Sequence, residues 1–491
     1  MSIVLRFTGY IFWFTSYGLP TMSHEYPRLM WFRNDLRVRD NPALAAAMAA
    51  GPTQAVYCWC EDQWESHDLS GARLALTLDA LEGLSQSLSA LGVPLTILKT
   101  PRFADVAAAF DTLIQAEGIR QVYSNAEYAL DERRRDRAVR DLCKNSDVDW
   151  HPHHGAIMQM PGVLKTGQGQ PYKVFTPFKN AWFKNWQSGG RSVRDLPKPQ
   201  QPPLSATEVD IELENRHAYD KAVFPSSEDQ AHQQLAAFIE DRVEHYQVDR
   251  DLPAIEGTSR LSAALVVGLL SPIQCLHAAL EVNQGEMTSG NEGIRTWISE
   301  LIWRDFYLNV IYSWPHVCMG KAFKENTDRV AWRYDKDDFE KWCNGETGFP
   351  IVDAAMKQLN ETGWMHNRLR MVSAMFLTKY LLIDWRWGER YFMRKLIDGH
   401  FASNNSGWQW SASTGTDAAP YFRLLSPLRQ AERFDKEGEF IKRYLPVLSD
   451  VSAKALMKPG DPELIAAGYP APMVDLKVAR EACLAAFKAI Q

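Results

Sequence analysis

The sequence predicts an α/β region at the N-terminus followed by a large, mostly helical region, and two observations lead to this fold class. Between residue 28 and about residue 150, short apolar runs alternate with amphipathic helical patterns, which is typical of a parallel sheet covered by helices. From about residue 226 onward, strand patterns are scarce and long helical patterns continue almost to the end of the chain. We therefore expect a parallel-sheet domain followed by an all-α domain.

The elements of the N-terminal region follow from these patterns in order. Buried strands are predicted at 28–33, 54–59, 93–98 and 119–124. Amphipathic helices are predicted at 71–92 and 103–118, and each of them ends at a glycine. Because no G-x-G-x-x-G sequence follows the first strand, a dinucleotide crevice of the usual kind is not expected there.

We divide the chain by composition. Residues 1–22 are expected to be an extension, with the true start at Met22, because the strand pattern begins only at Arg28. A secretory signal is the alternative. The sheet domain is expected at 23–154, a connector richer in Gly, Pro and polar residues at 155–225, and the helical domain at 226–491.

Composition and charge exclude several classes of protein. Hydrophobic residues make up 46% of the chain and charged residues 23%, which are ordinary values for a soluble globular protein. The net charge of −6 excludes a globally basic nucleic-acid coat, so a DNA-binding role requires a local basic face. Beyond the short apolar run near the N-terminus, no stretch is long enough to span a membrane, so a soluble protein is expected.

Neither the cysteines nor the common catalytic motifs predict a metal site or one of the widespread enzyme classes. The seven cysteines are scattered and form neither a disulfide framework nor a zinc site, which predicts a reducing cytoplasm and no metal. The sequence has no G-x-S-x-G, H-E-x-x-H or G-x-x-x-x-G-K-[ST] motif. The 17 tryptophans are unusual; they predict either a large aromatic core or surfaces that stack on flat ligands.

The segment EGTSRLSAAL, at 256–265, places small and hydroxyl residues before an apolar helical pattern. Thr258 and Ser259 resemble an N-cap, and free backbone N–H groups beside Arg260 and Ser262 would hold a phosphate or pyrophosphate. A plain capped helix is the alternative.

Two further segments place aromatic and polar side chains at helical spacing. In 295–314 the recurring residues are Trp297, Glu300, Trp303, Arg304 and Tyr307, which form either a ligand face or an aromatic core stripe with Glu300 paired to an arginine. In WMHNRLRM, at 364–371, the spacing predicts one face made of Trp364, Asn367, Arg368 and Met371, with Arg370 pointing elsewhere. That face suits a planar, partly polar ligand beside a phosphate, and an ordinary amphipathic helix is the alternative.

A polar loop is predicted within 396–423, where Asp398, Asn404, Asn405, Trp408 and Trp410 lie in a Gly- and Ser-rich context. Indole N–H groups need partners, so two tryptophans there favour a functional role over simple packing. The charged run DERRRDRAVRD, at 131–141, predicts a solvated helix face.

Several of these segments resemble motifs of the photolyase/cryptochrome family. The matching segments are EGTSRLS, ELIWRDFY, GFPIVDAAM, GWMHNRLRM and NNSGWQWSASTGTDAAPYFR. Their order and spacing match the family from about residue 28 to residue 446. Within the family, the chain most resembles bacterial class I cyclobutane pyrimidine dimer (CPD) photolyases of the folate-antenna type.

The resemblance implies a Rossmann-like antenna-binding α/β domain and a helical domain that binds FAD and DNA. It implies the cofactor FAD, as FADH⁻, and a 5,10-methenyltetrahydrofolate antenna. The implied enzyme is a deoxyribodipyrimidine photo-lyase, a carbon–carbon lyase, in which blue light drives an electron from FADH⁻ to a pyrimidine dimer flipped out of UV-damaged DNA. A cytoplasmic monomer is expected.

The family's cofactor contacts carry over to specific positions. The flavin contacts implied by the resemblance are Tyr246, Thr258, Ser259, Arg260, Leu261, Ser262, Trp297, Arg304, Arg370, Asp398, Gly399, His400 and Asn404. Among them, Arg370 and Asp398 match an ion pair beside the isoalloxazine ring, and Asn404 matches the residue that faces flavin N5. Asp131 and Glu132 match the antenna-binding pair.

The substrate contacts and the electron relay carry over in the same way. Glu300 matches the carboxyl group that hydrogen-bonds the dimer, and Trp303 and Trp410 match the two indoles that enclose it. The remaining dimer or DNA contacts implied are Arg250, Asn367, Arg368, Leu369 and Met371. Trp408, Trp385 and Trp332 match a relay from flavin to surface, which is chemically reasonable because indole is easily oxidised.

Three positions depart from the family pattern. His400 stands where the family usually has a second aspartate, and Asp131 replaces the asparagine of the antenna pair. Met319 stands where a lysine is expected, which removes a cation near the polyglutamate tail of a folate.

A signalling cryptochrome and a (6-4) photolyase are the alternative functions. The complete dimer pocket favours repair, and so does Asn404, where plant cryptochromes tend to have aspartate. A (6-4) photolyase is expected to have a histidine pair in 364–371, but only His366 is present there.

Overall fold

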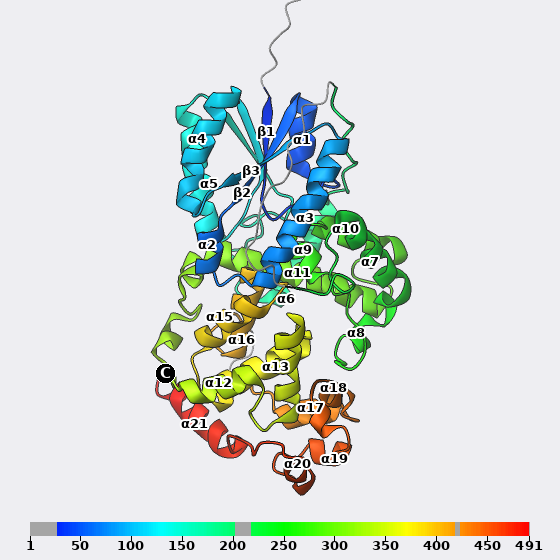
Figure 1. Cartoon of the computed structure of the whole chain (residues 1–491), viewed down its shortest axis with the longest axis vertical. Helices are drawn as coiled ribbons and strands as arrows, with labels where there is room; N and C mark the ends of the chain where they lie inside the picture. Colours follow the sequence, from blue (N-terminus) through cyan, green and yellow to red (C-terminus); the bar gives the residue numbers. More distant parts are fainter. Residues whose placement is uncertain (1–26, 202–217, 418–422, 491) are drawn as a thin grey trace, which may run out of the picture.

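The computed structural model describes residues 27–201, 218–417 and 423–490, so the extension predicted at 1–22 lies outside the described residues. An α/β half that contains one parallel sheet is followed by a helical half, and the two are stacked along the long axis of the molecule (Figure 1). The predicted fold class is confirmed.

The sheet has the strand order β3-β2-β1-β4-β5, and all of its strand pairs are parallel. The elements of this half are β1 (Arg28–Phe32), α1 (Pro42–Ala50), β2 (Thr53–Trp59), α2 (Glu61–Ser66), α3 (Gly71–Ala90), β3 (Leu95–Lys99), η1 (Phe103–Asp105), α4 (Val106–Glu117), β4 (Gln121–Asn125), α5 (Leu130–Asn145) and β5 (Asp149–His153). β1 and β2 are almost entirely apolar because helices cover both faces of the sheet.

The four predicted strands and two predicted helices are present, but the prediction missed β5. Its sequence, DWHPH, contains no apolar period and includes a proline. Proline is tolerated at a sheet edge, where its missing N–H is not needed by a further strand, and β5 is an edge strand. The predicted glycine stop of the helix at 103–118 is confirmed, because Gly118 has the left-handed φ of 64°.

The run at 131–141 lies in α5, as predicted, but its face is not wholly solvated. Arg135 is buried, and its guanidinium donates to Glu127 and Asp136, both at 2.7 Å. The prediction of a solvated face was therefore wrong for this residue.

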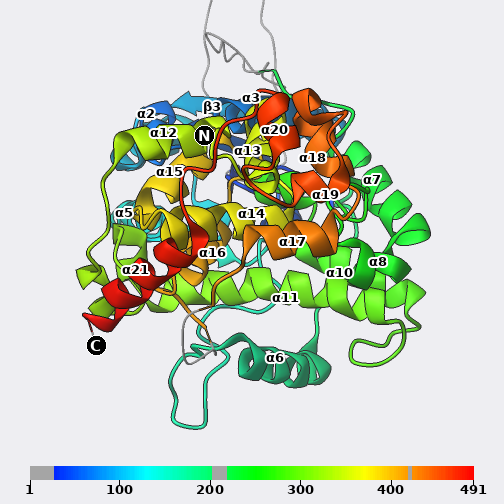
Figure 2. The ribbon, with the colours of Figure 1, turned by 90° about the horizontal axis from the view of Figure 1, so that it is seen from below.

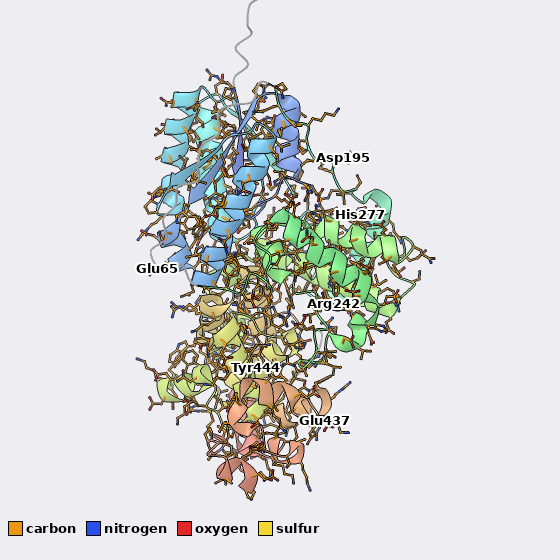
Figure 3. The ribbon with its side chains drawn as sticks, turned by 45° about the vertical axis from the view of Figure 1, so that its right-hand side comes forward. Glu65, Asp195, Arg242, His277, Glu437 and Tyr444 are labelled. Atoms are coloured by element: carbon orange, nitrogen blue, oxygen red, sulfur yellow. The ribbon has the colours of Figure 1, made fainter. Side chains whose placement is uncertain are left out.

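A segment that includes α6 (Phe175–Gly189) joins the two halves. Asp305 fixes it to the helical half, because its carboxylate accepts hydrogen bonds from the backbone N–H groups of Met158 and Gln159 and from Trp182 Nε1. Further on, the ring nitrogen Nε2 of His277 lies 2.7 Å from the carbonyl oxygen of Arg191. Figure 3 labels Asp195 of this segment and, below it, His277 of the helical half.

The helical half is built from many short helices. These are α7 (Glu228–Asp241), η2 (Val243–His245), α8 (Tyr246–Asp249), α9 (Ser262–Val267), α10 (Pro272–Val282), α11 (Glu292–Ser313), η3 (Pro315–Met319), η4 (Glu325–Arg329), α12 (Lys336–Asn344), α13 (Pro350–Thr362), α14 (Asn367–Met375), η5 (Phe376–Tyr380), α15 (Trp385–Lys395), α16 (Phe401–Ser411), α17 (Pro427–Phe434), α18 (Glu439–Tyr444), η6 (Pro446–Leu448), α19 (Ala453–Leu456), α20 (Pro462–Ala466) and α21 (Leu476–Lys488). The long helix α11 crosses this half, with α14 and α16 on one side and α6 on the other (Figure 2). No helix of the described ranges is long and apolar enough to cross a membrane.

Three of the local predictions were wrong. The region predicted as a polar loop contains the helix α16, whose Ser, Asn and Gly residues are poor helix formers. Packing against α11 and α15 overrides that preference. The N-cap predicted at Thr258 and Ser259 is also absent, since α9 begins only at Ser262 after Leu261, which provides no side-chain cap. Trp364 precedes α14 instead of lying on it, and His366 caps that helix.

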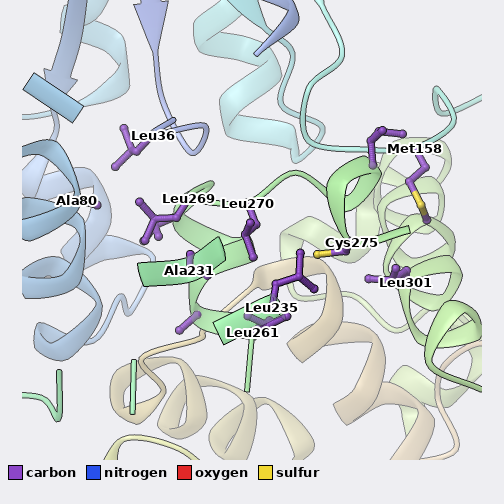
Figure 4. Close-up of a cluster of buried hydrophobic side chains, with 14 of the residues drawn as sticks. Leu36, Ala80, Met158, Ala231, Leu235, Leu261, Leu269, Leu270, Cys275 and Leu301 are labelled. Atoms are coloured by element: carbon purple, nitrogen blue, oxygen red, sulfur yellow. The ribbon is translucent and has the colours of Figure 1, made fainter. Parts of the chain in front are cut away.

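One hydrophobic core joins the two halves. Leu36 and Ala80 of the α/β half belong to the same buried cluster as Leu269 and Leu270 of the helical half (Figure 4). At this junction the buried Arg37 donates hydrogen bonds to the carbonyl oxygens of Gly268, Asp40 and Gly155. The relative position of the halves is therefore fixed by packing and by a buried cation.

Candidate functional site

A cavity of about 620 Å³, here called the central cavity, brings together residues from four of the sequence segments described above. The predicted site residues that line it are Tyr246, Arg250, Ser259, Ser262, Trp297, Glu300, Trp303, Arg304, Asn367, Arg370, Met371, Asp398, His400, Asn404, Trp408 and Trp410. Its volume is within the range of cofactor and ligand sites. The fold thus unites side chains that the sequence separates by more than 160 positions.

Other predicted site residues do not line this cavity. Four of them are buried in hydrophobic clusters: Leu261, Leu369, Trp332 and Trp385. Thr258 and Gly399 are next in sequence to residues that line the cavity, but they do not line it themselves. Arg260 pairs with Glu256 and covers the ring of Trp364. Arg368 pairs with Asp251 and lies over the ring of Phe434.

The cavity-lining face of α14 differs from the predicted one. Asn367, Arg370, Met371 and Ala374 line the central cavity, which is the i, i+3, i+4, i+7 face of one helix. The prediction that Arg370 points away from Asn367 and Met371 was wrong, because it centred the face on Trp364, which lies outside the helix, whereas Arg370 follows Asn367 by three residues and shares its face.

Arg370 and Asp398 form an ion pair in the wall of the cavity. Arg370 Nη2 lies 2.8 Å from Asp398 Oδ2 and 3.1 Å from Oδ1, while Arg370 Nε donates to the carbonyl oxygen of Met365 at 2.8 Å. The Asp398 side chain is 3% exposed, so water screens the pair poorly. The carbonyl oxygen of Met365 and the carboxylate of Asp398 together hold the Arg370 guanidinium in the cavity wall.

Asn404 is oriented by the backbone of α15. Its Nδ2 donates to the carbonyl oxygen of Glu389 at 3.0 Å, so the amide oxygen remains available to a ligand in the cavity. The carboxyl group of Glu389 accepts from Asn405 Nδ2 at 2.9 Å, and burial raises the pKa of Glu389 to about 7. Two adjacent asparagines of α16 are therefore held by one residue of α15.

His400 is the departure from the family pattern that lies in the site itself. Burial, with Arg304 and Arg73 nearby, lowers its pKa well below the ordinary value, so the imidazole is neutral. Its Nδ1 lies 2.8 Å from Ser403 Oγ. A neutral ring beside two arginines thus replaces the expected carboxylate.

Aromatic rings and one carboxylate make up another part of the wall. Trp303 stacks on Phe175 of α6, with ring centroids 3.5 Å apart and an angle of 8° between the planes. Glu300 pairs with Arg250, as expected if it were an arginine partner in a core stripe. It also lines the cavity and is 31% exposed, as expected for a residue on a ligand-binding face. Sequence reasoning missed Phe175, because the segment between the two domains was assigned no functional role.

A second cavity of about 550 Å³, here called the sheet-edge cavity, opens where β1, β2 and β4 end. Asp131 and Glu132, for which the sequence predicts an antenna-binding role, both line it. Burial and the neighbouring Glu127 raise the pKa of Glu132. Ligands commonly bind at the carboxyl ends of parallel strands, which is where this cavity lies.

The two cavities share a wall made of Val266, Arg304 and His400. Arg304 donates to the carbonyl oxygen of Ala156, and Gly399 lines only the sheet-edge cavity. Cys318 also lines that cavity, whereas the adjacent Met319 is 62% exposed. Within the described ranges, no group of three or more His, Cys, Asp or Glu side chains is arranged to hold a metal ion.

Trp408 connects the central cavity to the interior. It lines the cavity and packs directly on α15 at Gly388, the helix that also carries Trp385. Trp385 and Trp332 are buried, and neither indole N–H has a hydrogen-bond partner among the described residues. Their relay role remains a prediction.

Comparison with known proteins places these features in context. Residues 28–203 match the family described as DNA photolyase, and residues 297–489 match the FAD binding domain of DNA photolyase. The chain is 43% identical to the deoxyribodipyrimidine photo-lyase of Salmonella typhimurium, covering 94% of this chain and 98% of that protein.

Solved structures agree with the sequence relatives. A class III photolyase from Agrobacterium tumefaciens is 33% identical with a TM-score of 0.82, covering 94% of this chain and 97% of that one. A Synechocystis cryptochrome is 26% identical with a TM-score of 0.81, covering 96% of this chain and all of that one. The backbone alone therefore does not distinguish a repair enzyme from a cryptochrome.

Proposed function

This chain belongs to the DNA photolyase family, and on that premise we propose that it is a deoxyribodipyrimidine photo-lyase that uses FAD and light to split cyclobutane pyrimidine dimers in UV-damaged DNA. One observation carries the proposal: the central cavity is lined both by residues suited to a flavin and by residues suited to a dimer. The names of the sequence relatives support repair over signalling.

The residues of the central cavity fit FAD chemically. Arg370 and Asp398 offer a charged donor and acceptor to the polar edge of a flavin ring, and Asn404 offers an amide oxygen. Ser259 and Ser262 offer hydroxyl groups for a phosphate or ribose, and neutral His400 offers one ring nitrogen. When bound and reduced, the flavin supplies the electron that light transfers to the dimer.

The chain's own residues hold the substrate and exclude water. Trp303 and Trp410 provide flat apolar surfaces, and Met371 adds a flexible apolar contact. Glu300 presents a carboxyl group held by Arg250, positioned to hydrogen-bond the carbonyl or N–H edge of a pyrimidine. Photolyases are among the enzymes that take their target bases out of the duplex, and a walled cavity of this kind suits an extruded dimer.

Cations near the cavity are suited to the DNA backbone. Arg423 lies over the Trp410 ring, and Lys179 lies over the Phe175 ring. Arg250 and Arg368, which also pair with Glu300 and Asp251, lie on the same side and add donors for phosphate oxygens. We infer that DNA approaches the molecule on this side.

The sheet-edge cavity is the proposed site of a folate antenna. Asp131 and Glu132 line it, and the shared wall at His400 would keep two chromophores close. Met319 provides no charge for a polyglutamate tail, so we expect weaker binding of long-tailed folates. The division at 154/155 and 225/226, a monomeric state and a cytoplasmic location are parts of the same proposal.

Light-dependent repair tests the function directly. The reduced protein is incubated with a thymine-dimer oligonucleotide under blue light and in darkness, and restored thymines are quantified. Repair only in the light is expected. A flavin-bound protein that repairs nothing in the light would contradict the proposal and favour a signalling role.

A further inference from the structure

A continuous series of aromatic rings leads from Trp408 to the protein surface by a route that does not include Trp385 or Trp332. The ring centroid of Trp408 lies 6.0 Å from that of Trp342 on α12. Trp342 stacks on Phe339 at 5.7 Å, and Phe339 lies edge-on to Trp387 of α15 at 5.1 Å. The series ends at Tyr334, whose ring lies 5.8 Å from Trp387.

Tyr334 is placed to exchange electrons with solutes. Its side chain is 63% exposed, whereas Trp342 is fully buried and Trp387 is half-buried. The phenol donates a hydrogen bond to Asp384 Oδ2 at 3.2 Å, and Arg386 Nη1 holds that carboxylate at 3.1 Å. Oxidised phenols release their proton readily, and a hydrogen-bonded carboxylate is a ready acceptor for it.

Two nearby aromatic residues lack this combination of exposure and proton acceptor. The phenol of Tyr391, which contacts Trp342 and Phe339, donates to the amide oxygen of Asn360 and to a backbone carbonyl, neither of which is basic. Trp332 is only 7% exposed, its N–H has no partner in the described part of the chain, and Phe487 of α21 packs edge-on against it. Tyr334 is therefore the better end point for an oxidising equivalent.

We propose that Trp342, Trp387 and Tyr334 form a second electron-transfer branch, which refills Trp408 and exchanges electrons with a soluble thiol at Tyr334. The inference rests on the proposed function, because it requires a photoexcited oxidised flavin to take an electron from Trp408. Indole and phenol are the most easily oxidised of these side chains, and Phe339 serves only as packing between Trp342 and Trp387.

The electrons and protons of this branch balance. One electron passes from Trp342 to Trp408, one from Trp387 to Trp342 and one from Tyr334 to Trp387, so each indole returns to its neutral form. Tyr334 loses one electron, its O–H bond breaks, and the proton passes to Asp384. A thiol then gives its hydrogen atom to the phenoxyl oxygen, which restores tyrosine and leaves a thiyl radical. Asp384 releases its proton to water.

Radical trapping tests the branch by a readout other than repair. The holoprotein with oxidised flavin is illuminated without thiol in the presence of a nitrone spin trap, and peptide mass spectrometry locates the adducts. We expect an adduct on Tyr334 that Trp387→Phe reduces to the level of the dark control. The matched control is Tyr391→Phe, which changes the same cluster outside the branch and should leave the Tyr334 adduct in place.

A second variant covers the case in which Trp387→Phe perturbs packing. Tyr334→Phe keeps the exposed ring and removes only the hydroxyl, and it should abolish the tyrosyl electron paramagnetic resonance signal of the illuminated protein. Adducts on Trp332 with none on Tyr334 would overturn the second branch while leaving photoreduction intact. Adducts nowhere, together with no light-dependent dimer repair by the reduced protein, would overturn the proposed function and the branch together.

Discussion

At the scale of single residues, the pairing of Glu300 with Arg250 makes a test of the dimer contact possible. Glu300→Ala should leave FAD bound and lower repair per absorbed photon by about tenfold, since a hydrogen bond to a charged group contributes roughly 1.5–3 kcal/mol. The measurement is the quantum yield of repair by the reduced enzyme.

Glu292→Ala is the matched control for Glu300, because Glu292 lies exposed in the first turn of the same helix. An unchanged quantum yield for Glu300→Ala would remove Glu300 from the proposed substrate contacts. A loss of flavin in that variant would instead place Glu300 in cofactor binding.

Glu389 gives the molecule a pH-dependent stability. Burial raises its pKa from 4.5 to about 7 in the folded protein. Between these pH values the unfolded chain has lost the proton and the folded protein still binds it, so the free energy of unfolding falls as pH rises and is constant above about pH 7. Glu389→Gln removes this dependence and should stabilise the protein at pH 8 by about 1–3 kcal/mol.

Urea unfolding at several pH values measures the Glu389 effect. The difference between Glu389→Gln and the parent should shrink as pH falls from 7 and disappear below 4.5, where the parent carboxyl is protonated in both states. Glu340→Gln, at an exposed position of α12, is the control. A difference that is equal at acidic and alkaline pH would show that Glu389 does not titrate as described.

At the scale of elements, α15 and α16 approach so closely that only glycine fits at their contact. A Cβ atom on Gly388 would lie 2.1 Å from Trp408 Cη2 and 2.7 Å from Leu377 Cδ2. Alanine usually stabilises a helix relative to glycine, but this overlap reverses the sign. Gly388→Ala should destabilise the protein by about 1–3 kcal/mol and displace Trp408.

Thermal unfolding and tryptophan fluorescence together test the contact at Gly388. Gly189→Ala at the end of α6 is the control, because a Cβ there meets no atom within 4 Å. A Gly388→Ala protein as stable as the parent, with unchanged tryptophan emission, would mean that the two helices can separate at little cost.

At the scale of the whole molecule, Arg37 couples the α/β half to the helical half. Arg37→Met retains an unbranched side chain but leaves the carbonyl oxygens of Gly268, Gly155 and Asp40 without their donor. The expected loss is about 2–5 kcal/mol in the free energy of unfolding. Hydrogen exchange should accelerate in both halves, because one core runs through them.

Arg39→Met is the control for Arg37, since Arg39 is 42% exposed and pairs with the exposed Asp229. Such pairs contribute less than about 1 kcal/mol. Faster exchange confined to one half in Arg37→Met would indicate that the halves unfold separately.

The sequence by itself determined the fold class, four of the five strands and about half of the residues that line the central cavity. Strand and helix periods are local, so apolar runs such as 28–33 reveal buried strands without tertiary information. The long motifs around Glu300 and Asn404 carried the family resemblance, and through it the flavin and dimer positions. The edge strand β5 was missed because its sequence has no apolar period.

Only the tertiary structure decided where helices begin, which faces meet and how groups titrate. Packing placed Arg370 instead of Arg368 on the cavity face of α14, and it made α16 helical despite its polar sequence. The neutral state of His400, the contact between Gly388 and Trp408, and the ring series from Trp408 to Tyr334 all join residues distant in the chain or depend on burial. A sequence lists such residues, but contact distance and local dielectric exist only once the chain is folded.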